Sequence, residues 1–265
     1  MADTVLVGAV AYNPNVVPVW EGIRDHFRGS EVECDFVLYS NYERQVDDLI
    51  AGQIDIAWNT NLAYVRTVRR VGDRARALAM RDTDVGFRSF LVSRAGSGFH
   101  TLRDLRGRRL ALGSRDSAQA AILPLFFLRR AGLAEEDIAI LRFDSDVGKH
   151  GDTGRSELDA IRAVLDDQAD AAAIGVTTWD AIGREELAPG ALEAFWESPP
   201  YAHCNFTVLD ALDEERGEAW VRRLLEMRYE QNSEVMDLEG VREWVRPQLE
   251  GYAPLFAAVE EQGVA

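Results

Sequence analysis

Residues 111–128 (ALGSRDSAQAAILPLFFL) constrain the fold more than any other stretch of the sequence. The pattern predicts a short apolar strand at 110–112, a tight polar turn at 113–116 and a helix that opens at Ser117, which is an N-cap residue type. The first amides of such a helix have no intrahelical acceptor, and together with the helix dipole they attract anions. The stretch therefore predicts either an ordinary strand–turn–helix corner of an α/β protein or an anion-binding corner.

The same corner recurs elsewhere in the chain. A buried strand at 5–10 precedes the loop 11–15 and a helix, and a strand at 54–58 precedes the cap-rich turn 59–61 and another helix. In open α/β sheets, ligands lie outside the carboxyl ends of the strands. Three such corners in one chain favour the anion-site interpretation.

The remaining pattern continues the alternation of strands and helices. Strands are predicted at 32–38, 86–93, 138–143 and 170–175, and the segment 214–261 is mostly amphipathic helix. The central helix is predicted from Ser117 to about Ala131, with a kink at Pro124 because proline lacks an amide. Residues 144–155 (DSDVGKHGDTGR) are polar and rich in glycine, and we expect them to be the least compact stretch.

Composition limits the classes of partner. The chain has 265 residues and a net charge of −16, which argues against nucleic acid and anionic membranes and requires any anion site to use local donors. No apolar run approaches the ~18 residues of a membrane span. The N-terminus has no basic region typical of a signal peptide. Two compartments stay open: the cytoplasm, or the periplasm or cell surface if a leader was removed.

The cysteines and histidines predict no chemistry of their own. Cys34 and Cys204 match no zinc or redox spacing, so we expect two buried free thiols, no metal and no cofactor. Adjacent residues on a strand point to opposite faces, so His203 and Cys204 are not expected to meet. No catalytic residue is predicted.

Three motifs, GQIDIAWNTNLAYV, TLRDLRGRRLALGSRDSAQAAILPLFFL and AIRAVLDDQADAAA, in this order, resemble the phosphonate-type solute-binding proteins of ABC importers. The resemblance implies the α/β type II periplasmic-binding fold: two lobes, each a mixed, mostly parallel sheet flanked by helices, with ligand held between them. Lobe 1 would take residues 1–90 plus 205–265, and lobe 2 residues 91–204. Two crossing strands, GFRSFLVS and PPYAHCNFTVL, would join the lobes.

The resemblance carries over to a binding site only in part. Ser117 matches the first hydroxyl of a Ser-Thr pair, while Ala118 replaces the second. A family histidine aligns near Glu157, and Lys149 or His150 would substitute for it. Two family acids that hold a ligand amino group align with Thr177 and Cys204, which disfavours an amino-bearing ligand. Together with the turns described above, this predicts the ligand-binding residues Tyr12, Tyr42, Asn59, Thr60, Phe87, Ser114, Arg115, Ser117, Ala118, Lys149, His150 and Thr177.

Three functions stay open. The first is a monomeric solute-binding protein that captures a small oxyanion, phosphonate-like or phosphate-bearing, on helix N-termini and delivers it to an ABC importer permease. The second is a cytoplasmic enzyme on the same fold, a lyase acting on a small carboxylate or phosphate metabolite, with His150 as a base. The third is a ligand-sensing protein with a protein partner.

Overall fold

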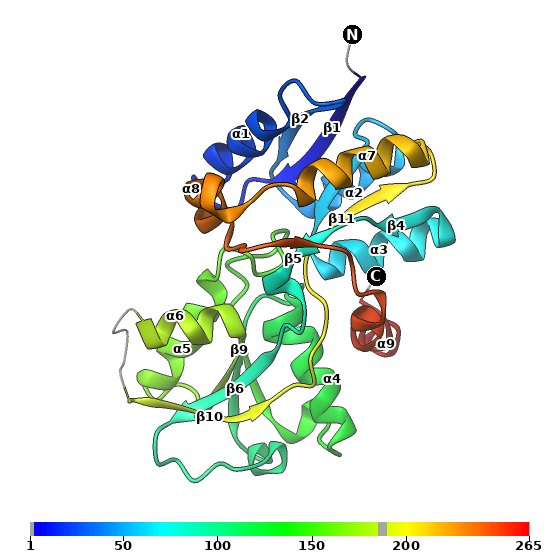
Figure 1. Cartoon of the computed structure of the whole chain (residues 1–265). Coiled ribbons are helices and arrows are strands. Elements are labelled where there is room, and N and C mark those ends of the chain that lie inside the picture. The colour runs from blue at the N-terminus through cyan, green and yellow to red at the C-terminus, as the bar shows by residue number, and fades with distance from the viewer. Residues whose placement is uncertain (1–2, 185–189, 265) are drawn as a thin grey trace. The chain divides into compact units, whose positions relative to one another are not determined.

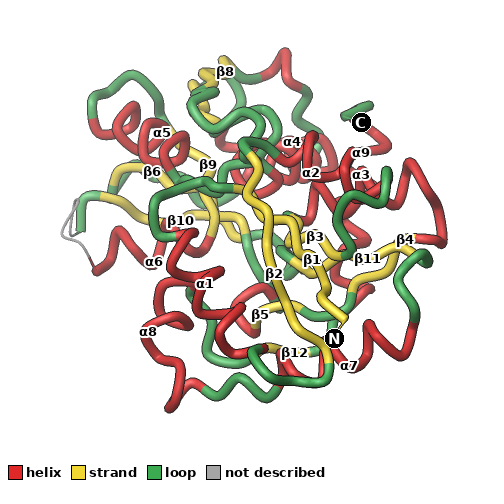
Figure 2. Tube along the Cα trace, turned by 90° about the horizontal axis from the view of Figure 1, so that it is seen from above, coloured by secondary structure: helices red, strands yellow, loops and turns green. Residues whose placement is uncertain are grey.

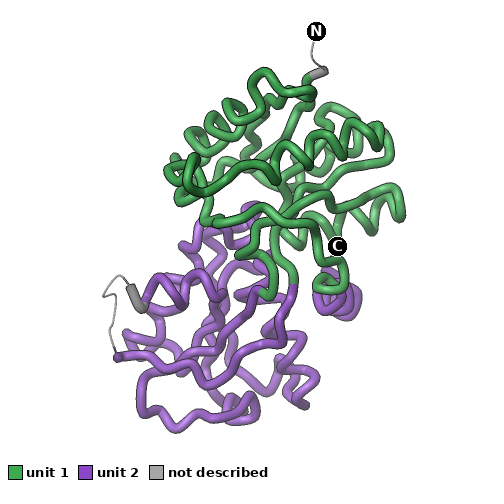
Figure 3. Tube along the Cα trace, in the orientation of Figure 1, with its two compact units in different colours: residues 1–86, 202–252 green, residues 87–201, 253–265 purple. Residues whose placement is uncertain are grey.

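A computed structural model describes residues 3–184 and 190–264. The chain forms two compact units: unit 1 comprises Met1–Gly86 and Ala202–Tyr252, and unit 2 comprises Phe87–Tyr201 and Ala253–Ala265 (Figure 3). The chain therefore passes between the units three times rather than the expected two. The segment from Ala253 onward belongs to unit 2, whereas residues 205–265 were all expected in the first lobe.

Unit 1 is built on a five-stranded mixed sheet of order β2-β1-β3-β11-β4, which Figure 2 shows in succession. Strand β1 runs parallel to β2 and β3, and β11 runs antiparallel to β3 and β4. A small antiparallel ladder pairs β5 with β12. The elements of unit 1 are β1 (Asp3–Val10), α1 (Val16–Phe27), β2 (Val32–Tyr39), α2 (Tyr42–Ile50), β3 (Ile56–Asn59), α3 (Asn61–Val71), β4 (Ala75–Ala77), β5 (Met80–Arg81), β11 (Asn205–Leu209), α7 (Glu214–Leu225), α8 (Tyr229–Glu239) and β12 (Trp244–Val245) (Figure 1).

The core of unit 1 is aromatic. Phe206 on β11 lies at its centre, with ring centroids 4.5 Å from Trp58, 4.8 Å from Trp220 and 5.5 Å from Trp244. Aromatic pairs at such distances add about 0.5–1.5 kcal/mol each to the free energy gained by burying their area. This cluster fixes β3 and β11 against the helices that follow β11.

Unit 2 is built on a second five-stranded mixed sheet, of order β10-β6-β9-β7-β8. Strand β7 runs parallel to β8 and β9, and β6 runs antiparallel to β9 and β10. Both sheets are mixed and carry helices, which is the predicted α/β class. The elements of unit 2 are β6 (Ser89–Arg94), β7 (Arg109–Leu112), a π-helical turn (Ala118–Ile122), α4 (Leu123–Arg130), β8 (Ala139–Arg142), α5 (Arg155–Leu165), β9 (Ala171–Gly175), α6 (Val176–Arg184), β10 (Leu192–Glu197) and α9 (Ala253–Gln262).

The predicted central helix is divided at Pro124. A π-helical turn, in which the Ile122 amide donates to the Ser117 carbonyl at 3.0 Å, precedes α4. Proline cannot donate to the carbonyl four residues before it, and that carbonyl, of Ala120, instead accepts from the Gly113 amide at 3.0 Å. The irregularity therefore ties the helix start to the end of β7.

Candidate functional site

In both units, the carboxyl ends of three strands lie at one sheet edge. In unit 1, β1 pairs in parallel with both β2 and β3. In unit 2, β7 pairs in parallel with both β8 and β9. Helices α1, α2 and α3 begin after the first set, and the π-helical turn, α5 and α6 begin after the second. Each unit therefore gathers helix N-termini at the sheet edge where α/β proteins bind ligands.

Ser117 occupies the N-cap position of the π-helical turn in unit 2. Its backbone is extended, and its Oγ accepts from the Ala120 amide at 3.2 Å. A hydroxyl that accepts one bond can still donate its own proton. The amides of Ala118 and Gln119 precede the first intrahelical donor. The corner can thus offer two amides and one hydroxyl to an anion.

The chain packs closely around this corner. Gly151 has φ +87°, and a Cβ there would lie 2.6 Å from Ser117 Oγ, so only glycine fits. Gln119 donates to Glu157 Oε1 at 3.1 Å, and Glu157 Oε2 accepts from the Gly175 amide at 2.8 Å. A Cβ on Gly175 would lie 3.2 Å from the ring of Phe87. Unit 2 therefore brings together Phe87, Ser117 and the loop that carries Lys149 and His150, which are far apart in sequence.

The loop 144–154 is ordered, which corrects the expectation that it is the least compact stretch. Asp146 is 1% exposed and accepts bonds from the Ser156 amide at 2.8 Å and from the Thr153 hydroxyl. His150 is 1% exposed with φ +53°, while Lys149 is half-buried. A buried carboxylate that gathers local donors replaces the apolar contacts that the loop lacks.

Two other predicted residues hold this loop in place. Ser114 Oγ accepts from the Asp146 amide at 2.9 Å, and the exposed Arg115 pairs with Asp144, whose Oδ1 also accepts from the Arg115 amide at 3.0 Å. The bonds from Arg115 lower the pKa of Asp144. These contacts give Ser114 and Arg115 structural roles. Thr177 is exposed in the first turn of α6.

The predicted residues of unit 1 are largely engaged within that unit. Tyr42 is buried in a core cluster beside Val10, and Tyr12 packs partly buried against the aromatic core. Asn59 accepts from Gln45 at 2.8 Å through Oδ1 and donates to the Thr207 hydroxyl at 3.0 Å through Nδ2.

The start of α3 offers fewer amides than its sequence suggests. Thr60 caps the Ala63 amide at 3.2 Å, and the side chain of Asn61 accepts from the Leu62 amide at 2.8 Å. These side chains satisfy two of the first three amides of the helix. The Ser117 corner, where the side chain satisfies only the Ala120 amide, therefore leaves more helix amides for an external acceptor than the start of α3 does.

Two polar residues of the Ser117 corner were not predicted. Asp116 is 5% exposed and accepts from the Gly148 amide through Oδ2 at 2.6 Å. Its Oδ1, like Oε1 of the buried Gln119, has no partner among the residues that the structure describes. Both atoms are hydrogen-bond acceptors. The sequence shows only an acid and an amide beside a cap, and no local pattern signals that they are buried.

His203 and Cys204 meet, contrary to the strand-alternation argument. Cys204 Sγ lies 3.1 Å from His203 Nδ1, because β11 begins only at Asn205 and both residues precede it in irregular backbone. Neither cysteine forms a disulfide, and both are buried, as predicted. Although burial alone would raise it, the charge of Arg81 holds the pKa of the nearby Asp84 well below its ordinary value.

Comparisons with known proteins agree on one family. The profile of the family described as "ABC transporter, phosphonate, periplasmic substrate-binding protein" matches residues 13–252. A protein of Prochlorococcus marinus, named as a probable ABC transporter phosphite binding protein PhnD1, is 23% identical over 235 residues, which are 84% of this chain and 76% of that protein. The phosphate-import protein PhnD of Mycolicibacterium smegmatis is 28% identical over 196 residues, covering 71% of this chain and 59% of that protein.

Solved structures show the same fold. PhnD1 of Prochlorococcus marinus in complex with methylphosphonate superposes with a TM-score of 0.76 at 18% identity and covers 99% of both chains. XAC2383 of Xanthomonas citri bound to ATP also gives 0.76, at 18% identity and 98% coverage of both chains. The aliphatic sulphonate binding protein SsuA of Escherichia coli gives 0.62. These neighbours confirm the type II periplasmic-binding fold. Within the described residues, no helix is long and apolar enough to cross a bilayer.

Proposed function

The chain belongs to the periplasmic phosphonate-binding proteins of ABC transporters, and we propose that it captures a small phosphorus oxyanion and delivers it to an ABC permease. The observation that carries this proposal is the Ser117 corner of unit 2, where a hydroxyl and the first amides of a helix follow the carboxyl end of β7. Donors of this kind bind phosphate groups in many α/β proteins.

The neighbouring acceptors narrow the ligand class. Asp116 Oδ1 and Gln119 Oε1 are buried acceptors beside the donors of the corner, and among the described residues neither has a partner. A ligand that fills such a site must accept bonds from Ser117 and donate at least one bond in return. Near neutral pH phosphate carries a proton on oxygen, and phosphite and methylphosphonate carry one on oxygen in a fraction of the molecules, whereas sulfate carries none. We therefore expect protonated phosphorus oxyanions to bind more tightly than sulfate.

The other end of the ligand is expected to be neutral. The family acids that hold an amino group align with Thr177, which is exposed on α6, and with Cys204, which contacts His203. Neither residue supplies a carboxylate for an ammonium group. Small oxyanions without an amino group fit these two replacements better than an aminoalkylphosphonate.

The comparisons also bear on the enzyme alternative. The matched family and the two named relatives are transport-binding proteins, so the lyase interpretation has no support among them. We propose a binding protein that functions as a monomer, with the permease as its protein partner.

Calorimetric titration of the full chain with phosphate, phosphite, methylphosphonate and sulfate tests this function. Ser117→Ala is expected to weaken oxyanion binding about tenfold to a hundredfold, because a hydrogen bond to a charged group is worth ~1.5–3 kcal/mol. The variant also loses a helix cap worth about 1 kcal/mol of unfolding free energy. Asp213→Ala is the matched control, since Asp213 caps the Arg216 amide of α7 at 3.1 Å and lies outside the proposed site.

Three results of these titrations would contradict different parts of the proposal. Absence of binding by every phosphorus oxyanion contradicts the proposed ligand class. Sulfate binding as tightly as phosphate contradicts the role given to Asp116 and Gln119. Equal binding losses in Ser117→Ala and Asp213→Ala would show that the loss of stability, and not the loss of a ligand contact, weakens binding.

A further inference from the structure

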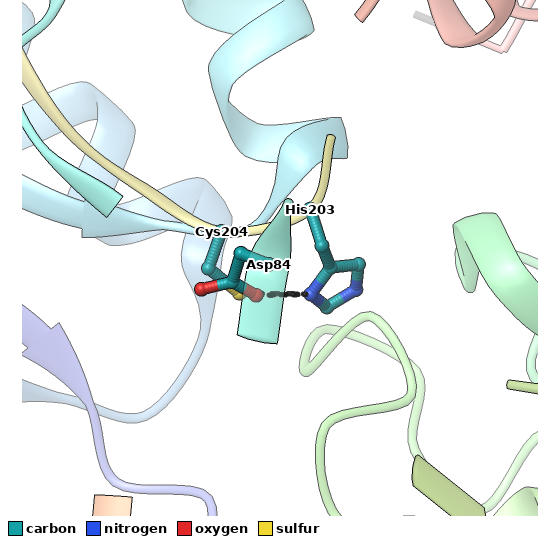
Figure 4. Close-up of side chains that lie close together, drawn as sticks. All are labelled: Asp84, His203 and Cys204. Carbon is teal, nitrogen blue, oxygen red and sulfur yellow. Dashed lines mark hydrogen bonds and ion pairs between the residues drawn. The ribbon is translucent and has the colours of Figure 1, made fainter. Parts of the chain in front are cut away.

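Three potential metal ligands converge in the interior of unit 1 (Figure 4). One ligand atom each of Asp84, His203 and Cys204 lies within 4.8 Å of the others, and all three residues are at most 5% exposed. His203 Nδ1 is 3.1 Å from Cys204 Sγ and 3.3 Å from Asp84 Oδ1. The set is assembled from opposite parts of the chain, since Asp84 follows β5 and the other two precede β11.

The backbone holds the two segments together. The His203 amide donates to the Asp84 carbonyl at 3.0 Å. This bond fixes the backbone of His203 and Cys204 next to that of Asp84. Figure 4 shows the three side chains pointing toward one another. Their convergence therefore rests on backbone pairing as well as on side-chain rotamers.

One nitrogen is shared by two neighbours. His203 Nδ1 has a single in-plane position, which holds either a proton or a lone pair. With a proton it can donate to Asp84, and with a lone pair it can accept from the Cys204 thiol, but it cannot do both at once. A metal ion bound at this position would contact the nitrogen, the sulfur and the carboxylate together.

The two separations that involve His203 are close to those that a tetrahedral ion requires. With Zn–N and Zn–O near ~2.0 Å and Zn–S near ~2.3 Å, a tetrahedron places nitrogen and oxygen ~3.3 Å apart and nitrogen and sulfur ~3.5 Å apart. The observed distances are 3.3 Å and 3.1 Å. These two separations need only a few tenths of an ångström of side-chain adjustment, and the third, between Asp84 and Cys204, lies within 4.8 Å.

The carboxylate is already held in position. Arg81 donates to both oxygens of Asp84, at 2.6 Å and 2.9 Å, and Arg81 in turn pairs with Glu239 at 3.2 Å. The charge of Glu239 offsets that of Arg81, so Asp84 and a Cys204 thiolate supply two negative charges for a divalent ion. Partners of this kind orient metal ligands from outside the coordination sphere.

We propose that Asp84, His203 and Cys204 bind a divalent transition-metal ion of the Zn²⁺ class through Oδ1, Nδ1 and Sγ. Binding displaces the thiol proton of Cys204 and leaves His203 neutral, with its proton on Nε2. Mixed sulfur, nitrogen and oxygen ligands suit zinc and cobalt and do not suit calcium or magnesium. The ion would link the segment after β5 to the segment before β11.

Cobalt is the probe, because Co²⁺ occupies zinc sites and reports thiolate ligation by a charge-transfer band. The full chain, freed of metal by a chelator, is titrated with CoCl₂ and then with ZnCl₂. We expect a thiolate-to-cobalt band that saturates at one equivalent and is abolished by zinc. Cys204→Ala should lose the band, and His203→Gln should weaken cobalt binding at least tenfold.

Cys34→Ala is the matched control, since Cys34 is a second buried free thiol that lies among apolar core residues of unit 1. It should keep the band unchanged. No band in the wild-type protein at stoichiometric cobalt, or a band that survives in Cys204→Ala, overturns the proposal. Should Cys204→Ala fail to fold, zinc-edge X-ray absorption of the wild-type protein decides, because a bound thiolate places sulfur at about 2.3 Å from the metal.

Discussion

Which residue types a position of this protein tolerates depends on the residues that contact it in space, as well as on its own conformation. Gly151 shows this, because its positive φ and its closeness to Ser117 Oγ both exclude a side chain. The sequence shows only one glycine among several in a polar stretch. Its position against the helix start becomes evident once the loop and the corner are placed together.

Cys34 gives a prediction about pH. Burial raises the pKa of its thiol from its ordinary value of 9.0 to about 12. Above pH 9 the unfolded chain loses this proton while the folded protein keeps it, so the unfolded state binds fewer protons and stability falls as pH rises. Between pH 9 and 12 the contribution of the Cys34 thiol to the free energy of unfolding should fall by about 1.4 kcal/mol per pH unit.

Urea unfolding of wild type and Cys34→Ala at pH 8, 9.5 and 10.5 measures this contribution. The difference in unfolding free energy between the two proteins should shrink as pH rises, because other titrating groups are common to both. A difference that stays constant from pH 8 to 10.5 would show that the Cys34 thiol is ionised as readily in the folded protein as in the unfolded chain.

At the scale of an element, the loop 144–154 depends on Asp146. Its Oδ2 accepts from the Ser156 amide at the start of α5. In Asp146→Asn, one orientation of the side chain turns its NH2 toward the Ser156 amide, which then loses its acceptor. The other orientation turns the NH2 toward Thr153, whose hydroxyl then loses its acceptor. We expect a loss of about 1–3 kcal/mol in unfolding free energy and faster proteolysis within the loop.

Asp144→Asn is the control for this variant. Asp144 lies in the same loop but pairs with Arg115, whose side chain is 68% exposed, and such ion pairs contribute less than about 1 kcal/mol. Denaturant unfolding and limited proteolysis compare the two proteins. Equal effects would contradict the view that the buried carboxylate, and not the loop's total charge, orders this segment.

At the scale of the whole molecule, the C-terminal segment returns to unit 2 after unit 1 is complete. Helix α9 packs on α4, and Gln262 donates to the Ile122 carbonyl of the π-helical turn at 2.8 Å. Removing residues 253–265 should therefore loosen unit 2 and weaken oxyanion binding there. Hydrogen exchange should rise in α4 and the π-helical turn and stay unchanged in β1 and α1.

Glu261→Ala is the comparison for the truncation. It removes only a half-exposed ion pair with Arg129 at 3.8 Å and should leave exchange in α4 as in the wild type. If the truncated chain instead exchanges faster in unit 1, the assignment of this segment to unit 2 is wrong.

The sequence by itself determined the alternation of strands and helices, the α/β class, the family and the strand–turn–helix corner at Ser117. These follow from local periodicity, capping chemistry and motifs, which depend on neighbouring residues. It placed most strands to within two or three residues, including β1, β2 and β9.

Only the tertiary structure decided which distant residues lie next to each strand–turn–helix corner. It turned the start of the central helix into a π-helical turn tied to Gly113, ordered the loop around Asp146 and placed α9 in unit 2. It also brought His203 and Cys204 to Asp84, some 120 residues earlier in the chain. The physical reason is that burial, hydrogen-bond satisfaction and side-chain convergence are properties of segments distant in sequence, and no local pattern records them.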